Sequence, residues 1–303
     1  MISRRQFLRW IVRLGATGAL AATYGVLVEP LLRLRVARYD LQPARWPAGL
    51  DLTIAALADI HACEPWMTQE RIRSVVAHAN SLGADLIVLL GDYVGGHRYV
   101  TGRVAARDWA AALSGLKAPL GVHAILGNHE WWEDRAVQQS RQGPPRSRRA
   151  LEAVGIPVYD NDAVRLSKAG QPFWLAGLGD QLAFWPGRRR YPGRRIGVDD
   201  LTATLTNVTD DAPVVLLAHE PDIAVRMPER VSLMLSGHTH GGQVRLFGWS
   251  PVTPSRYGNR FAYGHVRERC DVIVSGGLGC SIMPVRVGVP PEIVLVTLSA
   301  KTA

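Results

Sequence analysis

The stretch LTIAALADIH, residues 52–61, indicates the fold class of this chain. Residues 52–58 form a short, mostly apolar run, which is typical of a strand that is buried on both faces. The run stops at Asp59, and His61 follows two residues later. Ligands collect beyond the carboxyl ends of strands in open α/β sheets, so a strand that ends in a carboxylate and an imidazole indicates a polar site there.

The same pattern recurs along the chain. The apolar run at 85–90 ends at Gly91-Asp92, and the run at 122–126 ends at Gly127-Asn128-His129. Each glycine lets the backbone turn sharply, so that the next side chain points away from the strand end. Further strands are expected at residues 173–178, 214–218, 232–235, 272–274 and 293–298. Two of these later runs are followed by histidines, so they extend the pattern of polar strand ends.

Apolar residues at helical spacing predict helices over residues 70–82 and 104–116. Strands alternate with these helices early in the chain and crowd together later. The order predicts an α/β layered domain with helices outside a buried sheet core, extending over residues 47–303. Residues 1–40 are expected to lie outside this domain. The basic, irregular stretches at 141–149 and 184–195 are predicted to be surface loops.

The chain begins with an apparent targeting segment. SRRQFL, residues 3–8, resembles the twin-arginine export signal, and a moderately apolar run follows over residues 10–28. This predicts export by the twin-arginine machinery to the periplasm or the outer face of the cytoplasmic membrane. An uncleaved anchor over residues 10–28 and a basic amphipathic helix docked on the domain are the alternatives.

The charge of the chain is concentrated in its first residues. The net charge is +9, and residues 1–38 hold seven arginines against the single acid Glu29, which is +6 and leaves 9 − 6 = +3 for the remainder. A body this mildly basic gives no reason to expect a specific nucleic-acid partner. The three cysteines, Cys63, Cys270 and Cys280, do not form a disulfide framework and are expected to be buried thiols, with a Cys270–Cys280 bridge as the alternative.

Eight potential metal ligands or acid–base groups lie at or just beyond five strand ends. They are Asp59, His61, Asp92, Asn128, His129, His219, His238 and His240. Any one of them alone would be unremarkable, since a single Asp after a strand is usually a helix cap. Together they predict a metal site at the carboxyl ends of the strands.

These residues resemble the motifs of the calcineurin-like metallophosphoesterases. The matching motifs are Asp59-x-His61, Gly91-Asp92, Gly127-Asn128-His129-Glu130, His219 and Gly237-His238-Thr239-His240. The stretch GHTHGGQVRLFG and the C-terminal stretch SGGLGCSIMPVRVGVPPEIVLVTL resemble a bacterial subgroup with twin-arginine or membrane-anchoring N-termini. The resemblance implies a layered α/β/β/α sandwich with its metal site at the carboxyl ends of the strands.

The resemblance also implies a ligand set for two divalent or mixed-valence metal ions, without distinguishing Mn, Fe and Zn. One ion would take Asp59, His61 and His240, and the other would take Asn128, His219 and His238. Asp92 would bridge them. His129 would be a catalytic group near the leaving oxygen and not a ligand. Glu130 would either hold a histidine in its tautomer or cap a helix.

The implied activity is hydrolysis of a phosphoester, with a phosphodiester or pyrophosphate bond favoured, by attack of a metal-bridging hydroxide. The substrate could be lipid-linked, and an anionic membrane surface is a further candidate partner. One alternative is a UDP-diacylglucosamine-type pyrophosphate hydrolase at the membrane. An alternative of another class is a non-catalytic metal-binding module on the same fold. The loop from Arg188 to Arg195 would either grip an anionic lipid surface or be a solvated loop.

Overall fold

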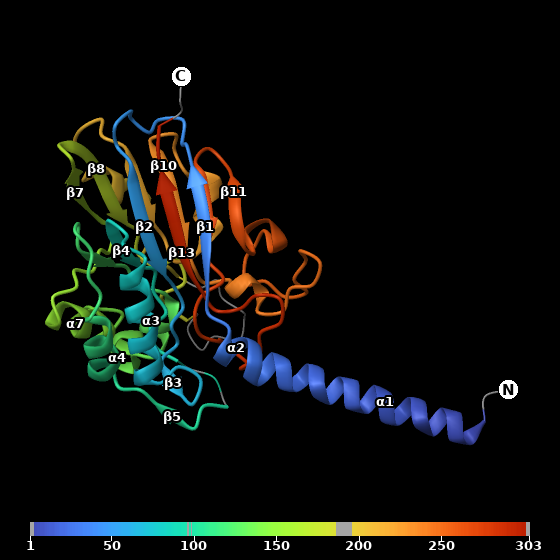
Figure 1. The fold of residues 1–303 in the computed structure, drawn as a ribbon. Helices are drawn as coiled ribbons and strands as arrows, with labels where there is room; N and C mark the ends of the chain where they lie inside the picture. Colours follow the sequence, from blue (N-terminus) through green and yellow to red (C-terminus); the bar gives the residue numbers. More distant parts are fainter. Residues whose placement is uncertain (1–2, 96, 98, 186–195, 301–303) are drawn as a thin grey trace.

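The computed structural model describes residues 3–300 apart from 96, 98 and 186–195, and its described part contains two large β-sheets packed face to face (Figure 1). The first sheet has the order β1 (Arg35–Leu41), β13 (Glu292–Leu298), β2 (Leu52–Leu57), β4 (Leu86–Leu89), β6 (Val122–Ala124). The second has the order β11 (Gly264–Arg267), β12 (Asp271–Val274), β10 (Val231–Ser236), β9 (Val214–Leu217), β8 (Gln171–Gly177), β7 (Asp162–Lys168). A short pair, β3 (Cys63–Glu64) and β5 (Gly102–Arg103), lies outside both.

Helices cover the outer face of each sheet. The first sheet packs against α3 (Gln69–Ser81), α4 (Ala106–Leu113) and α7 (Arg146–Ala153). The second packs against α8 (Leu201–Thr206) and the 3₁₀ helices η2 (Pro221–Arg226) and η4 (Gly258–Phe261). The remaining short helices near the site are α5 (Asn128–Trp132), α6 (Arg135–Ser140) and η3 (His240–Gly242). The expected α/β/β/α sandwich is therefore confirmed.

The apolar strands have no alternating pattern because both of their faces are buried. In β2, Ile54 and Ala56 face the second sheet, whereas Ala55 and Leu57 face the helices. Full burial of an aliphatic side chain contributes about 1.5–3 kcal/mol, so both faces of this strand stabilise the sandwich. The parallel pairing of β2 with β4 and of β4 with β6 brings their carboxyl ends to one edge.

The sheet begins earlier in the chain than expected. Residues 35–41, which were excluded from the domain, form β1 and pair in parallel with β13. Charged residues interrupt this edge strand and hide it from a search for apolar runs. Arg35 lies 2.8 Å from Glu292, a fully buried carboxylate at the start of β13, which fixes the strand at the sheet edge.

Other departures from the expected elements have similar causes. The predicted loop at 141–149 is wrong in its second half, because α7 begins at Arg146 and buries Leu151 beneath a largely polar sequence. The edge strands β7 and β11 were not predicted, since polar residues break their apolar pattern. Most of the predicted loop at 184–195 lies outside the described residues.

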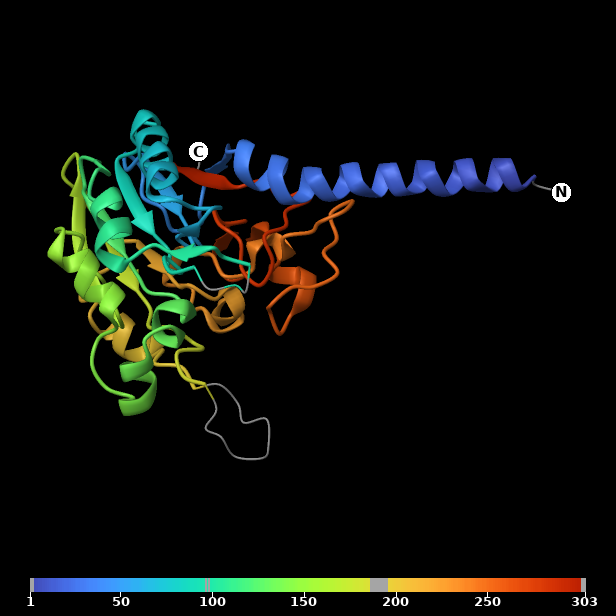
Figure 2. The ribbon, with the colours of Figure 1, turned by 90° about the horizontal axis from the view of Figure 1, so that it is seen from below.

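The N-terminal segment forms a helical rod of α1 (Arg4–Thr23), a π-helical turn η1 (Tyr24–Val28) and α2 (Glu29–Leu32), which projects from the body (Figures 1 and 2). Among the described residues, Arg4–Leu32 is the one helix that is long and apolar enough to cross a membrane, judged by its length and composition. No residue of α1 is buried. The alternative of a helix docked on the domain is therefore not supported for α1, whereas η1 and α2 bury Gly25, Glu29 and Pro30 against the body.

The ends of β4 and β6 approach each other so closely that only glycine fits. Gly91 has φ +92°, and a Cβ atom there would lie 2.4 Å from the amide nitrogen of Gly127. Gly83, after α3, also has a positive φ of +64°, but a Cβ atom there would meet open space.

We predict that Gly91→Ala lowers the free energy of unfolding by about 1–3 kcal/mol more than Gly83→Ala does. Both substitutions replace a glycine that has a left-handed backbone conformation. Only the alanine at position 91 also clashes with the backbone of Gly127. Urea unfolding of both variants measures the difference. Equal losses would contradict the close approach of the two strand ends.

Candidate metal centre

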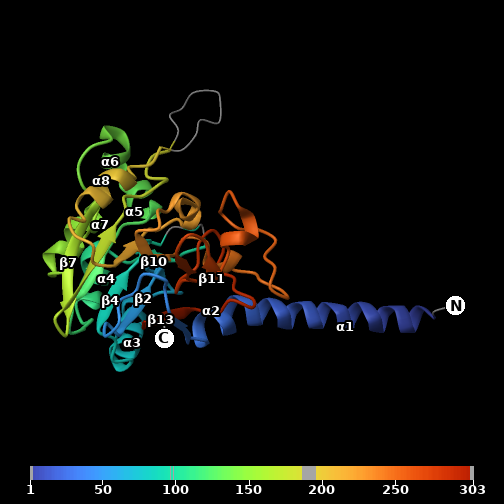
Figure 3. The ribbon, with the colours of Figure 1, turned by 90° about the horizontal axis from the view of Figure 1, so that it is seen from above.

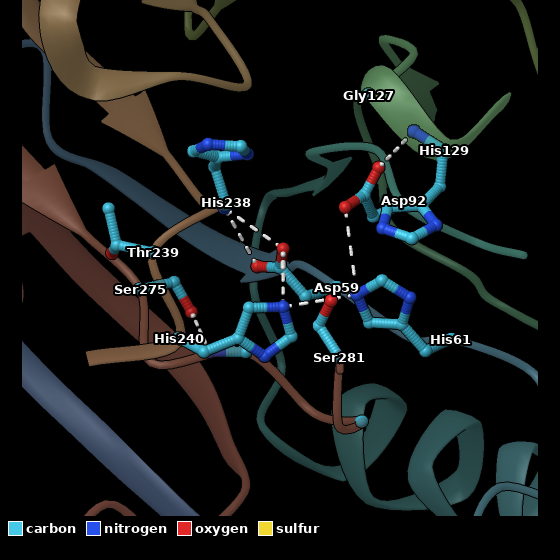
Figure 4. A network of polar contacts seen from close by, with 12 residues as sticks. Asp59, His61, Asp92, Gly127, His129, His238, Thr239, His240, Ser275 and Ser281 are labelled. Atoms are coloured by element: carbon cyan, nitrogen blue, oxygen red, sulfur yellow. Dashed lines mark hydrogen bonds and ion pairs between the residues drawn. The ribbon is translucent and has the colours of Figure 1, made fainter. Parts of the chain in front are cut away.

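The eight predicted side chains lie where strands of both sheets end. Asp59 and His61 follow β2, Asp92 follows β4, and His219 follows β9. Asn128 and His129 open α5 just beyond β6, and His238 and His240 follow β10. The two sheets thus contribute to one buried cluster from opposite sides, in the region drawn in Figure 4.

The backbone of this cluster is strained in a recurrent way. Five of its residues that are not glycine have φ between 47° and 70°: Asp59, His61, Asp92, His238 and His240. Such conformations cost on the order of 1–3 kcal/mol each and persist where surrounding structure enforces them. They turn each side chain inward immediately after its strand. Gly237 makes room for this, since a Cβ atom there would lie 2.5 Å from Oδ2 of Asp59.

Four of the side chains form a first group of potential ligands: Asp59, His61, Asp92 and His240. Nε2 of His61 lies 3.0 Å from Nε2 of His240, and the latter lies 3.3 Å from Oδ1 of Asp59 (Figure 4). Nε2 of His61 also lies 3.6 Å from Oδ2 of Asp92. All four side chains are buried.

A second group consists of Asp92, His219 and His238, with Asn128 beside it. Nε2 of His219 lies 3.2 Å from Oδ2 of Asp92. Oδ1 of Asn128 lies 2.8 Å from Nδ1 of His238. Asp92 therefore belongs to both groups, and its carboxylate lies between them.

Backbone carbonyls fix the tautomers of two of these histidines. Nδ1–H of His61 donates to the carbonyl of Val94 at 3.0 Å, and Nδ1–H of His219 donates to the carbonyl of Leu90 at 2.7 Å. The Nε2 lone pair of each ring is thereby turned toward Asp92. Burial lowers the pKa of His61 to about 3, so this imidazole is neutral at pH 7, as a metal ligand must be.

The donor set fits two divalent cations. Two imidazole nitrogens 3.0 Å apart, surrounded by buried carboxylates, form an arrangement that a cation stabilises. Backbone carbonyls that accept the second ring N–H of a histidine ligand are a usual outer support of protein metal sites. The two overlapping groups provide separate places for two ions with one carboxylate in common.

His129 lies at the rim of the cluster and outside both groups. Its backbone N–H donates to Oδ1 of Asp92 at 2.9 Å, and its ring packs edge-on against that of His61 with centroids 4.8 Å apart (Figure 4). Nδ1 of its half-buried ring has no hydrogen-bond partner among the described residues. The side chain is thus placed next to the ligands, with a buried ring nitrogen that no described residue pairs.

Glu130 supports the backbone of the site. It hydrogen-bonds to no histidine ring in the described part of the chain, so the prediction that it holds a histidine tautomer is not supported. Its carboxylate accepts from the amides of Asp92 (2.7 Å), Tyr93 (2.8 Å), Val94 (3.2 Å) and Gly127 (2.8 Å). The bond to Gly127 caps α5, as the alternative prediction stated. The other three bonds, which sequence did not reveal, fix the loop that carries Asp92.

Arg286 is a further part of the site that was not predicted. It is fully buried, and its guanidinium donates to the carbonyls of Gly276 (2.8 Å), Val289 (2.9 Å) and Gly279 (3.0 Å). Its Nη2 also lies 3.3 Å from Nδ1 of His240. The only signal in the sequence is a lone arginine within the apolar stretch VRVGV, residues 285–289.

Comparisons with known proteins agree with this geometry. The sequence profile described as calcineurin-like phosphoesterase matches residues 52–242. The chain is 30% identical to the uncharacterized metallophosphoesterase YkuE of Bacillus subtilis (strain 168), over 99% of this chain and 98% of that protein. It is also 30% identical to the phosphodiesterase YaeI of Escherichia coli (strain K12), over 98% of this chain and 100% of that protein.

A protein of Danio rerio called "transmembrane protein with metallophosphoesterase domain" is 29% identical to the chain. The match covers 92% of this chain and 60% of that protein. The profile match begins at the first residue of β2 and ends within the turn that follows His240. It therefore includes every side chain of the cluster.

We predict that Glu130→Gln lowers the free energy of unfolding by about 1–3 kcal/mol and reduces metal content, because the amide group cannot accept from all four backbone N–H groups. Glu133→Gln is the matched control, since Glu133 ends the same helix but pairs with Arg103 at the surface. Urea unfolding and elemental analysis measure both effects. Two variants that behave alike would refute the supporting role of Glu130.

Proposed function

The chain belongs to the calcineurin-like phosphoesterase family, and on this basis we propose that it is a two-metal phosphodiesterase whose reaction is centred on Asp92. The observation that carries the proposal is the pair of buried donor groups that share this carboxylate. The similarity to a protein named as a phosphodiesterase favours a diester over a monoester. A pyrophosphate bond is the second candidate.

In the proposed site, Asp59, His61 and His240 would hold one ion, and Asn128, His219 and His238 would hold the other. Asp92 belongs to both groups. When bound, divalent cations act as Lewis acids on phosphoryl oxygens and activate water at neutral pH. Imidazole with carboxylate ligands suits Mn, Fe and Zn alike.

The residues of the chain have separate tasks in this scheme. The carbonyls of Val94 and Leu90 accept from Nδ1–H of His61 and His219 and so direct the Nε2 atoms of both rings inward. His129 donates a proton to the leaving oxygen, and its place against the ring of the ligand His61 and beside Asp92 supports this role. Every expected ligand position carries its expected residue, which argues against a non-catalytic metal-binding module.

We further propose that residues before β1 act as a twin-arginine signal or an uncleaved anchor, which would place the enzyme at the outer face of the cytoplasmic membrane. The support is SRRQFL at residues 3–8, the span-length helix that projects from the body, and the similarity to a protein named as transmembrane. The phosphoesterase domain then begins at β1 and not at residue 47.

We expect His129→Ala to lower the turnover of a soluble aryl phosphodiester by about 10²–10⁴-fold while metal content stays unchanged, because the residue moves a proton and binds no ion. Steady-state kinetics and elemental analysis of the manganese-loaded protein measure both quantities. His78→Ala, at an exposed position on α3, is the control. Loss of metal from the His129 variant would show that its role is misassigned.

Asp92→Ala should reduce the content of both metal ions, since both donor groups lose a member. Asp211→Ala, which removes a fully exposed carboxylate, should retain both ions. Elemental analysis after loading with Mn²⁺ tests the pair. An Asp92 variant with two ions and full activity would overturn the central place of this carboxylate.

A further inference from the structure

A hairpin close to the metal site presents a phenylalanine to solvent at its tip. Leu246 and Trp249 exchange backbone hydrogen bonds of 2.9 and 3.0 Å, so Phe247 and Gly248 form a two-residue turn. Both have positive φ, +52° and +81°. Phe247 is fully exposed, with a relative accessibility of 107%. A bulky residue in this backbone region is strained, and an exposed phenyl ring contributes nothing to the core.

A second loop has the same two properties. Ile282 has φ +49° and is 74% exposed, and Met283 beside it is also exposed. A β-branched residue in the left-handed region is an outlier that folding alone does not favour. We call the two segments, residues 246–249 and 282–283, the apolar tips.

The side chain of Gln243 ties the second apolar tip to the chain that leads to the first. Its Nε2 donates to the carbonyls of Met283 (2.8 Å) and Val285 (3.0 Å), and its Oε1 accepts from the amide of Ser281 (2.6 Å). Backbone bonds between Arg245 and Val287 and between Val287 and Gln243 complete the link. Both apolar tips are therefore mounted on one hydrogen-bonded unit, residues 243–245 paired with 285–287, and each leaves it as an exposed segment.

The segment of residues 285–287 also holds the base of the N-terminal rod. The amide of Arg286 donates to the carbonyl of Gly25 at 2.8 Å. A Cβ atom on Gly25 would lie 3.0 Å from Cγ2 of Val287, so the rod packs directly on residues 285–287. The loops around residues 244–260 leave the body on the side from which α1 projects (Figures 1, 2 and 3).

The second apolar tip, residues 282–283, also follows directly from the metal site. Ser281, the residue before Ile282, lies next to His61 and His240 (Figure 4). Two residues earlier, the amide of Gly279 donates to the carbonyl of Asp59 at 2.7 Å. The chain thus passes from the metal ligands to the exposed isoleucine within a few residues.

We propose that the apolar tips insert into the interface of the bilayer that holds α1, so that the mouth of the metal site faces the membrane. Aromatic and aliphatic side chains at a rigid tip are suited to the boundary between headgroups and acyl chains. Arg33, an exposed residue at the base of the rod, favours an anionic surface on this side of the body. If the proposed hydrolysis is correct, the substrate is then a phosphoester carried by a membrane lipid.

Single-cysteine labelling of the full chain tests the docking independently of any turnover. Phe247→Cys and Ile282→Cys would carry an environment-sensitive fluorophore, since the three native cysteines are buried. Ala169→Cys is the matched control, because Ala169 and Gly170 form an exposed turn with φ +49° and +79° between β7 and β8, away from α1. Each protein is reconstituted into phosphatidylcholine vesicles with or without phosphatidylglycerol.

Nitroxide-bearing lipid in these vesicles should quench the labels at 247 and 282 strongly and the label at 169 little. Equal quenching at 247 and 169 would overturn the proposal. The hairpin tip would then be covered by a protein partner or by a second copy of the chain, and not by lipid.

The substrate class is tested with phosphatidylglycerol, itself a phosphodiester, in the same vesicles. Phe247→Ser should lower the rate on this lipid by about tenfold relative to the rate on a soluble aryl phosphodiester, which corresponds to the loss of one inserted apolar side chain. An unchanged ratio of the two rates would exclude lipid-borne substrates while leaving the labelling result intact. A wild-type protein that hydrolyses neither compound would refute the proposed function alone.

Discussion

The carboxylate of Asp92 connects the parts of the site to one another. Its Oδ2 lies within 3.6 Å of His61 and 3.2 Å of His219, while its Oδ1 accepts from the amide of His129. Its own amide is held by Glu130, so the loop that carries it cannot shift independently. An anionic group this deeply buried is tolerated because positive charge or donors surround it. The other side chains of the cluster and the amides beside them provide these donors and potential cation ligands around Asp92.

The sandwich makes this arrangement possible because each sheet brings a different set of donors. The first sheet contributes carboxylates, an amide and two imidazoles, whereas the second contributes three imidazoles from the ends of β9 and β10. Neither sheet alone could surround a pair of cations. Positive φ at the clustered residues stores strain, and the apolar contacts between the sheets hold those residues in place.

Sequence predicted the central strands and the clustered side chains, because strands buried on both faces have long apolar runs and end at polar residues. It did not predict the edge strand β1, whose arginines break the apolar pattern and whose partner β13 lies over 250 residues away. It also missed Arg286, since a buried guanidinium satisfied by carbonyls of Gly276, Gly279 and Val289 has no local signature. Contacts between distant segments determine these features, and local pattern does not encode them.

The contact between Arg286 and Gly25 has a consequence for maturation of the protein. Gly25 lies after the last residue of α1, within η1, and it is there that the rod is fastened to the body. Cleavage of the proposed signal segment before Gly25 would release the exposed helix and leave the fastened turn in place. Arg286, which bonds to Gly25 through its backbone amide and lies beside His240 through its guanidinium, would keep both contacts before and after cleavage. A secreted form and a tethered form would then share one intact catalytic core.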